Sequence, residues 1–197
     1  MSEDEVKEKL LEMKESADVM IDLAYSSIIY DRAEIANEVY DLENENDLLA
    51  EELVRLIIED SKAGVLTTDE TLALLKLTSA LEEMCDGARD IADVELRDIE
   101  LHPVLKMSID ESDEVFLREV LDESSVLCDK TLGEVRLASE LGAWVIAIRR
   151  GNRWYYDPGK YTHLKAGDVL YMTTTRESRG RVIRIVGGEK NESETYK

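Results

Sequence analysis

The chain has 197 residues, of which 35% are charged, and its formal net charge of −21 is concentrated in one half. Residues 1–110 carry 30 acidic and 10 basic residues, a net of −20, whereas residues 111–197 carry 15 and 14, a net of −1, which predicts two units joined near residue 110. The spacing of the two Cys and two His matches no zinc-ligand pattern and gives no support for a disulfide framework. The sequence has no apolar run of about 18 residues and no signal sequence, so we expect a cytoplasmic protein.

Apolar residues recur at alternating spacings of four and three in two stretches of the first half, which predicts two amphipathic helices. Asn46 interrupts the second row, where a polar side chain can fix the register of packed helices. The two rows are Val6, Leu10, Met13, Ala17, Met20 and Ala24, and then Ile35, Val39, Leu42, Asn46, Leu49, Leu53 and Leu56.

The segment SKAGVLTTDET interrupts this pattern and predicts a helix end at Gly64 and a new N-cap at Thr67 or Thr68. A third apolar row follows and decays after about Arg97. Three helices with short connections predict an antiparallel three-helix bundle over residues 1–100. The third row is Leu74, Leu77, Leu81, Met84, Ala88 and Ile91.

His102 and Pro103 are expected to stop helical structure and to lie in a linker at residues 101–111, because the residue before a proline avoids the helical region. Residues 112–187 predict a small α/β unit, which makes the fold class α+β overall, and residues 188–197 predict a flexible tail. Within this unit we expect strands at Val115–Leu121 and Ala143–Ile148, one short helix from Thr131 to Gly142, and turns at Gly151–Asn152 and Ala166–Asp168. The stretch Arg176–Val186 fits either a helix or a strand, and we favour the helix.

The segment LEEMCDGARDIAD, residues 81–93, concentrates acids on a predicted helix. At 100° per residue these acids point away from the apolar row, as do the acids of the preceding helix. Carboxylates four residues apart repel unless a cation or an Arg intervenes, and Arg89 is the basic residue nearby. Hard cations such as Mg²⁺, Mn²⁺ or iron suit such ligands, but a solvated helix face also explains these acids and is the interpretation we favour. The candidate metal ligands are Glu43, Asp47, Glu82, Asp86 and Asp90.

The stretch EEMCDGARDIAD resembles the signature helix of PhoU-type bundles, in which an acid precedes an Asp by four positions. Glu82 and Asp86 match this motif, and Glu43 and Asp47 match its counterpart on the preceding helix. The resemblance implies metal binding on the outer surface of the bundle. Two features differ from the family, since this chain has a single three-helix copy and has Met84 and Cys85 where a basic residue is usual.

Residues 144–184 carry nine basic residues against three acidic ones, a local net of +6 in which aromatic side chains are interspersed. Such a patch attracts an anion, and aromatic rings beside Arg can stack on bases. A surface complementary to the acidic bundle explains the charge equally well. We expect no nucleic-acid partner, because a chain of −21 is repelled by phosphate backbones outside the patch.

The stretch from residue 130, KTLGEVRLASELGAWVIAIRRGNRWYYDPG, together with THLKAGDVLYM resembles the TrkA C-terminal domain, also called the RCK C-terminal domain, over residues 112–187. The resemblance implies that Gly167 and Asp168 shape a turn, that the domain pairs as a homodimer, and that it senses ligands for potassium or other cation channels and transporters. Cyclic di-adenosine monophosphate, or another nucleotide, is the implied ligand. The implied ligand-facing residues are Ile148, Arg149, Arg150 and Asn152.

No glycines have the Gly-x-Gly-x-x-Gly spacing, so we expect no Rossmann-type NAD or ATP site, and no catalytic constellation predicts an enzyme. We therefore expect a regulatory accessory subunit of cation transport, associated with a membrane only through its transporter. In this hypothesis an anion bridges two Arg149/Arg150 pairs across a dimer and changes the spacing of the two bundles. The alternative is a PhoU-type, metal-binding regulator of phosphate uptake, and a third reading is an adaptor without a small ligand. The absence of Gln and the high charge fit a protein from a hot environment.

Overall fold

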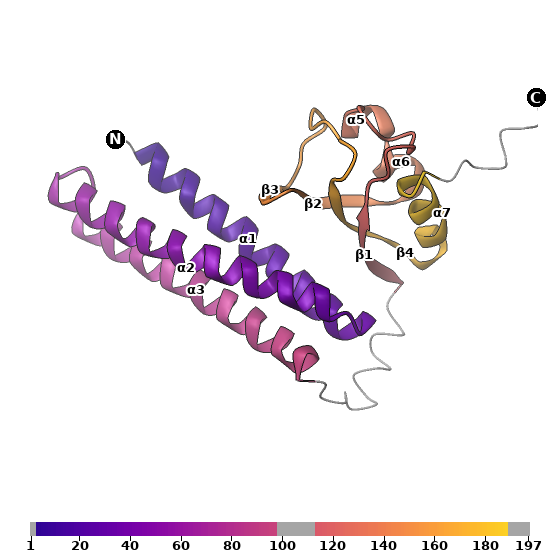
Figure 1. The fold of residues 1–197 in the computed structure, drawn as a ribbon. Coiled ribbons are helices and arrows are strands. Elements are labelled where there is room, and N and C mark those ends of the chain that lie inside the picture. The colour runs from indigo at the N-terminus through magenta and orange to yellow at the C-terminus, as the bar shows by residue number, and fades with distance from the viewer. Residues whose placement is uncertain (1–2, 98–112, 189–197) are drawn as a thin grey trace, which may run out of the picture. The chain divides into compact units, whose positions relative to one another are not determined.

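A computed structural model describes residues 3–97 and 113–188 of the chain (Figure 1). It contains two compact units that divide between residues 106 and 107, three helices in the first and a sheet with helices in the second, so the predicted α+β class is confirmed. The linker at 101–111, with its His102–Pro103 stop, and residues 189–197 of the tail lie outside the described residues. The predicted domain bounds stay predictions. Within the described ranges, none of the helices combines the length and the apolar character that a bilayer crossing requires.

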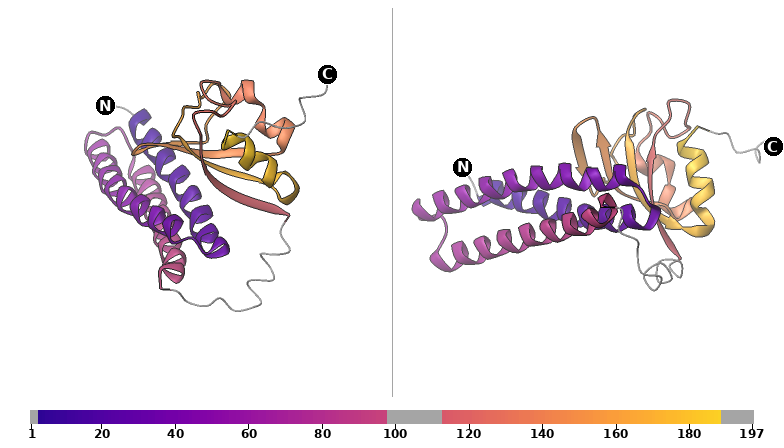
Figure 2. Two further views of the ribbon diagram at one scale, coloured as in Figure 1. Left: turned by 45° about the vertical axis from the view of Figure 1, so that its right-hand side comes forward. Right: turned by 60° about the horizontal axis from the view of Figure 1, so that its bottom comes forward.

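The first unit consists of α1 (Glu3–Tyr30), α2 (Ala33–Lys62) and α3 (Thr68–Leu96), which lie side by side in antiparallel order (Figures 1 and 2). Each helix packs against the other two. Of the two predicted caps, Thr67 is the one used. Its Oγ1 accepts a hydrogen bond from the backbone N–H of Glu70, while the Glu70 carboxylate accepts from the Thr67 N–H, which is a capping box.

The apolar rows predicted for α1 and α2 are buried or partly buried, which confirms both. In α3 the prediction is partly wrong, because Leu77 and Met84 are exposed while the smaller Thr78 and Cys85 are buried. Leu77 and Met84 therefore lie beside the face that α3 packs against α1 and α2, and the small side chains on that face let the helices approach.

Asn46 is buried in the bundle and links α2 to α1. Its Nδ2 donates to the Ser16 hydroxyl at 2.7 Å and to the Leu42 carbonyl of its own helix at 2.9 Å. A buried amide that must find a hydroxyl on the facing helix penalises other alignments of α1 against α2. This geometry agrees with the register role expected from the sequence.

The second unit is built on an antiparallel sheet of order β1-β4-β2-β3. The strands match the predicted strand segments closely, and Gly151 has a φ of 62° in the predicted two-residue turn between β2 and β3. The predicted helix at Arg176–Val186 is confirmed as α7. The strands are β1 (Glu114–Val120), β2 (Trp144–Arg150), β3 (Arg153–Tyr156) and β4 (Val169–Thr175).

The single helix predicted between Thr131 and Gly142 is two helices, α5 (Leu132–Val135) and α6 (Leu137–Leu141), separated by Arg136 in the left-handed conformation. In one straight helix, Leu137 and Leu141 would point at least 140° away from Leu132. The break at Arg136 lets both sets of apolar side chains reach the same core. Burial therefore overrides the local helical pattern here.

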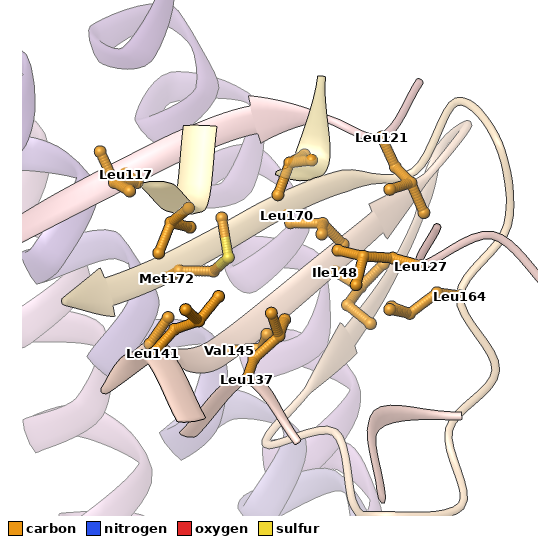
Figure 3. Packing of buried hydrophobic residues seen from close by; sticks show 13 residues of the cluster. Leu117, Leu121, Leu127, Leu137, Leu141, Val145, Ile148, Leu164, Leu170 and Met172 are labelled. Carbon is orange, nitrogen blue, oxygen red and sulfur yellow. The ribbon is translucent and has the colours of Figure 1, made fainter. Parts of the chain in front are cut away.

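Helices α6 and α7 pack against the sheet and enclose the core of the second unit. Figure 3 shows Leu137 and Leu141 of α6 close to Val145 of β2 and Met172 of β4. Side chains from three segments outside the helices and strands, Leu121, Leu127 and Leu164, complete this core. The core fixes β2, and with it the hairpin that carries the predicted ligand residues.

Candidate functional site

The β2–β3 hairpin gathers guanidinium groups and aromatic rings at its turn. Arg150 pairs with Arg153 at the last strand position, and Gly151 and Asn152 form the turn between them. The guanidinium groups of Arg150 and Arg153 lie 5.1 and 5.0 Å from the centre of the Tyr155 ring. Cations over an aromatic face are attracted by its quadrupole, so Tyr155 holds both groups near the turn.

Arg150 is fixed by a buried carboxylate. Its Nε and one Nη donate to the two carboxylate oxygens of Asp168 at 2.7 and 2.8 Å, and the same Nη donates to the His163 carbonyl at 2.7 Å. The hydrogen bonds to Asp168 raise the pKa of the Arg150 guanidinium above its ordinary value. Asp168 also accepts from the Lys165 N–H at 2.8 Å and follows Gly167, whose φ is 83°, so these residues do shape the turn before β4.

Arg149 points to the other face of β2, because successive side chains of a strand alternate. Its guanidinium lies 5.8 Å from the centre of the Trp154 ring. Trp154 is stacked on Tyr156, with ring centres 5.9 Å apart and planes 6° apart, and its ring centre is 4.9 Å from that of Tyr171. This aromatic row spans β3 and β4, and Tyr171 was not anticipated from the sequence.

The four predicted ligand residues do not converge on one point. Ile148 is fully buried in the core, so only its backbone could meet a ligand. Arg150 is committed to Asp168, while Arg149 lies half-buried beside Trp154. Asn152 is exposed in the turn, and the neighbouring Arg153, which was not chosen from the sequence, is exposed as well. The ligand-facing role of the four residues stays a prediction, and Asn152 and Arg153 are the exposed side chains at the turn.

In the first unit, four of the predicted metal ligands are exposed, which agrees with the outward direction derived from the helical wheel. The fifth, Glu43, is buried, and here that direction is wrong, because α2 contacts α3 on this side as well as α1. Burial and the charge of Asp47 raise the pKa of Glu43 above its ordinary value. The four exposed residues are Asp47, Glu82, Asp86 and Asp90.

Arg89 forms ion pairs with Glu43 of α2 and, at 3.2 Å, with Asp86 of its own helix. Within residues 3–97 and 113–188, no three His, Cys, Asp or Glu side chains are grouped so that they could hold a metal ion. The carboxylates implied as metal ligands by the PhoU resemblance thus do not fit a metal centre in this arrangement. Carboxylates this close need a metal ion or an Arg between them, and here Arg89 is the cation that lies between Glu43 and Asp86.

Two protein families match the chain, one for each unit. The PhoU domain family matches residues 10–94, and the TrkA-C domain family matches residues 116–187. These matches confirm the two resemblances and their order in the chain. The acidic residues and Arg89 lie within the first match, and the β2–β3 hairpin lies within the second.

Among curated proteins, Protein YrdA of Escherichia coli strain K12 and that of Shigella flexneri are each 36% identical to the chain over 56 residues. This similarity covers 28% of the chain and spans only 28% of the length of those relatives. Such a short overlap transfers no activity from YrdA.

The solved structures similar to the chain include the following three, all with low TM-scores. The RCK_C domain dimer of S. agalactiae BusR in complex with c-di-AMP has a TM-score of 0.36 and 18% identity, covering 40% of this chain and 96% of that one. The RCK C domain of the potassium transport protein KtrA in complex with c-di-AMP has a TM-score of 0.32 and 23% identity, covering 42% and 91%. S. agalactiae BusR with its busA-promotor DNA has a TM-score of 0.36 and 15% identity, covering 64% and 68%. TM-scores this low support no functional conclusion.

Proposed function

We propose that this chain, which joins a PhoU domain at residues 10–94 to a TrkA-C domain at residues 116–187, is a non-enzymatic regulatory subunit of a potassium or other cation transport system. The TrkA-C domain senses an anionic small ligand, and the β2–β3 hairpin is the sensing element. The observation that carries this proposal is the concentration of guanidinium groups and aromatic rings on that hairpin, within the TrkA-C match.

The hairpin suits a nucleotide because it combines two kinds of contact. A guanidinium donates paired hydrogen bonds to phosphate oxygens, and Arg153 is exposed at the turn. An aromatic ring offers a face for a planar base. Asn152, exposed beside Arg153, adds an amide that can both donate and accept. A cyclic dinucleotide such as cyclic di-adenosine monophosphate supplies phosphates and bases together.

We further propose that the ligand bridges two copies of the TrkA-C domain, with Asn152 and Arg153 of each copy facing the phosphates. These residues replace the Arg149/Arg150 pairs expected from the sequence, because Arg150 is held by Asp168 and Arg149 lies on the opposite face of the hairpin from Arg153. Ligand binding then biases the dimer toward one arrangement, and a transporter in contact with the protein senses the change. In this proposal the protein is cytoplasmic and binds the membrane only through the transporter.

The test is isothermal titration of the ligand-free chain with cyclic di-adenosine monophosphate, and then with ATP and AMP. We expect saturable binding of the cyclic dinucleotide, at least tenfold weaker binding by Arg153→Gln, and unchanged binding by Arg181→Gln. Arg181 is a matched control because it is an exposed Arg on α7. Absence of heat with all three nucleotides would overturn the proposal. Light scattering measures the molar mass of the chain with and without ligand and so tests whether it forms a dimer.

The PhoU match supports a second candidate, in which the bundle regulates phosphate uptake. Its metal-binding form has less support, because Arg89 is paired with two of the carboxylates that would hold the metal. Deleting the gene and measuring uptake of labelled phosphate and of rubidium, a potassium substitute, separates the two candidates. A defect in phosphate uptake alone would favour the second candidate.

A further inference from the structure

A row of apolar residues runs along the surface of α3, beside the face that packs in the bundle. Its members recur at alternating spacings of four and three residues, so they share one side of the helix, and the centre of this side lies about 100° from the centre of the buried face. Leu77 is 46% and Met84 is 40% exposed, and Ile91 alone is partly buried. This exposed α3 row consists of Ala73, Leu77, Ala80, Met84, Gly87 and Ile91.

Gly87 stands in this row, well inside α3. A glycine within a helix is less favourable than an alanine, because its backbone loses more conformational freedom on folding. A Cβ added at Gly87 would meet no side chain and no neighbouring segment within 4 Å, so packing within the described parts of the chain does not require a glycine here. A second helix that approaches the α3 backbone closely at this point would require one.

Large and small residues alternate along the exposed α3 row in a pattern that suits a second copy of the same helix. The positions are symmetric about Glu82, and each small residue on one side matches a large residue at the same distance on the other side. If a two-fold axis at this level relates two antiparallel copies of α3, every large side chain lies opposite a small residue of the other copy. The opposed residues are Leu77 and Gly87, Met84 and Ala80, and Ile91 and Ala73.

The same arrangement brings opposite charges together along one flank of the row. Lys76 and Asp90 are exposed and lie on the same flank, about 60° and 100° from the centre of the row. A two-fold axis perpendicular to the helices places this flank against the same flank of the other copy. Lys76 of one copy is then within about 3 Å of the level of Asp90 of the other along the helix axes. Glu83, near the axis, faces its own copy, so two attractive pairs oppose one repulsive pair.

We propose that the exposed α3 row is a self-association surface, on which α3 of a second copy packs in antiparallel orientation about a two-fold axis at the level of Glu82. Burial of Leu77 and Met84 drives the contact, and the small residues opposite them let the two helices approach. This surface belongs to the first unit and does not depend on the TrkA-C dimer of the proposed function. Either contact can form without the other.

The test couples amines directly to carboxylates in the full chain with a carbodiimide, which adds no spacer, and identifies the joined peptides by mass spectrometry. We expect a Lys76–Asp90 junction whose yield rises as the chain concentration increases from micromolar to millimolar. Within one helix these residues are separated by about 21 Å, so a direct junction between them must join two copies. The Lys9–Glu52 ion pair, at 2.8 Å within one chain, is the internal control for the coupling reaction.

Ala80→Glu places a charge in the contact and should lower the yield of the Lys76–Asp90 junction about tenfold, because burial of an unpaired charge is unfavourable. Ala80 is exposed, so the bundle should keep its helicity by circular dichroism. Leu48→Glu is the control, since it introduces the same charge at a 69% exposed position of α2 and should leave the yield unchanged.

A native chain that forms the Lys9–Glu52 junction but no Lys76–Asp90 junction at any concentration would overturn the proposal. An undiminished Lys76–Asp90 yield in Ala80→Glu would overturn it as well. A chain that pairs only through its TrkA-C domain would show a doubled mass in light scattering without the Lys76–Asp90 junction. The two self-association proposals can therefore fail separately.

Discussion

Arg150 at the end of β2 and Asp168, the residue directly before β4, form a bidentate ion pair, with donor–acceptor distances of 2.7 and 2.8 Å. The Asp168 side chain is 1% exposed, so the pair lies at the edge of the core. Asp168 also accepts from the backbone of Lys165, and Arg150 donates to the carbonyl of His163. The Arg150–Asp168 pair therefore connects the β2–β3 hairpin, the turn before β4 and the segment that contains His163.

Replacing Asp168 by Ala should destabilise the second unit by about 3 kcal/mol, because a partly buried guanidinium and a backbone N–H lose their acceptor. Denaturant unfolding followed by tryptophan fluorescence reports on this unit selectively, since Trp144 and Trp154 are the two tryptophans of the chain. Glu123→Ala, at an exposed position of the same unit, is the control for the loss of one acidic side chain. Equal effects of the two substitutions would show that the ion pair contributes nothing measurable.

Replacing Thr67 by Ala should destabilise the first unit by about 1 kcal/mol, because the capping box at the start of α3 is lost. Thr68→Ala is the matched control, since Thr68 is already the first helical residue. Thermal unfolding monitored at 222 nm should show a lower midpoint for Thr67→Ala alone. A lower midpoint only in Thr68→Ala would place the cap one residue later.

The stability of the first unit should depend on pH through Glu43. Its pKa is raised in the fold, first by burial and then by Asp47, so the folded state binds a proton more tightly than the unfolded chain. The contribution of this proton binding to the free energy of unfolding is fully present below the ordinary pKa of 4.5 and is lost as pH rises through the higher folded pKa. The free energy of unfolding of the first unit should therefore fall as the pH rises toward neutrality.

Thermal unfolding between pH 4 and pH 7 measures this effect. Glu43→Gln should lose part of the decline seen with rising pH, whereas Glu51→Gln, an exposed substitution on the same helix, should retain it. Parallel pH profiles for the native chain and Glu43→Gln would contradict the assignment to Glu43.

Gly133 lies so close to the backbone of Lys160 that a side chain does not fit. Its N–H donates to the Lys160 carbonyl at 2.8 Å, and a Cβ at Gly133 would lie 2.9 Å from the same oxygen. Gly133→Ala should therefore cost about 1–3 kcal/mol in the fluorescence-detected unfolding described above. Gly159→Ala, with no atom within 4 Å of the added Cβ, should change stability far less. A greater loss of stability in Gly159→Ala than in Gly133→Ala would show that the backbone at Lys160 moves away from the added Cβ at little cost.

Features that depend on residues close together in the sequence were predictable. These are the three helices with their apolar repeats, the Thr67 cap and the Gly151–Asn152 turn. The α5/α6 break was not predictable, since left-handed Arg136 is stabilised by a core that other segments complete. The same limit explains why the buried face of α3 was misplaced at Leu77 and Met84.

For the candidate sites, the sequence by itself determined which residues are present: paired acids on two helices of a PhoU-like bundle, and adjacent arginines on a hairpin of a TrkA-C-like unit. Only the tertiary structure decided how they are used. Arg150 meets Asp168 from 18 residues away, and Arg89 meets Glu43 from 46 residues away. Such pairings depend on where the chain reverses and which faces are buried, and no local periodicity encodes that choice.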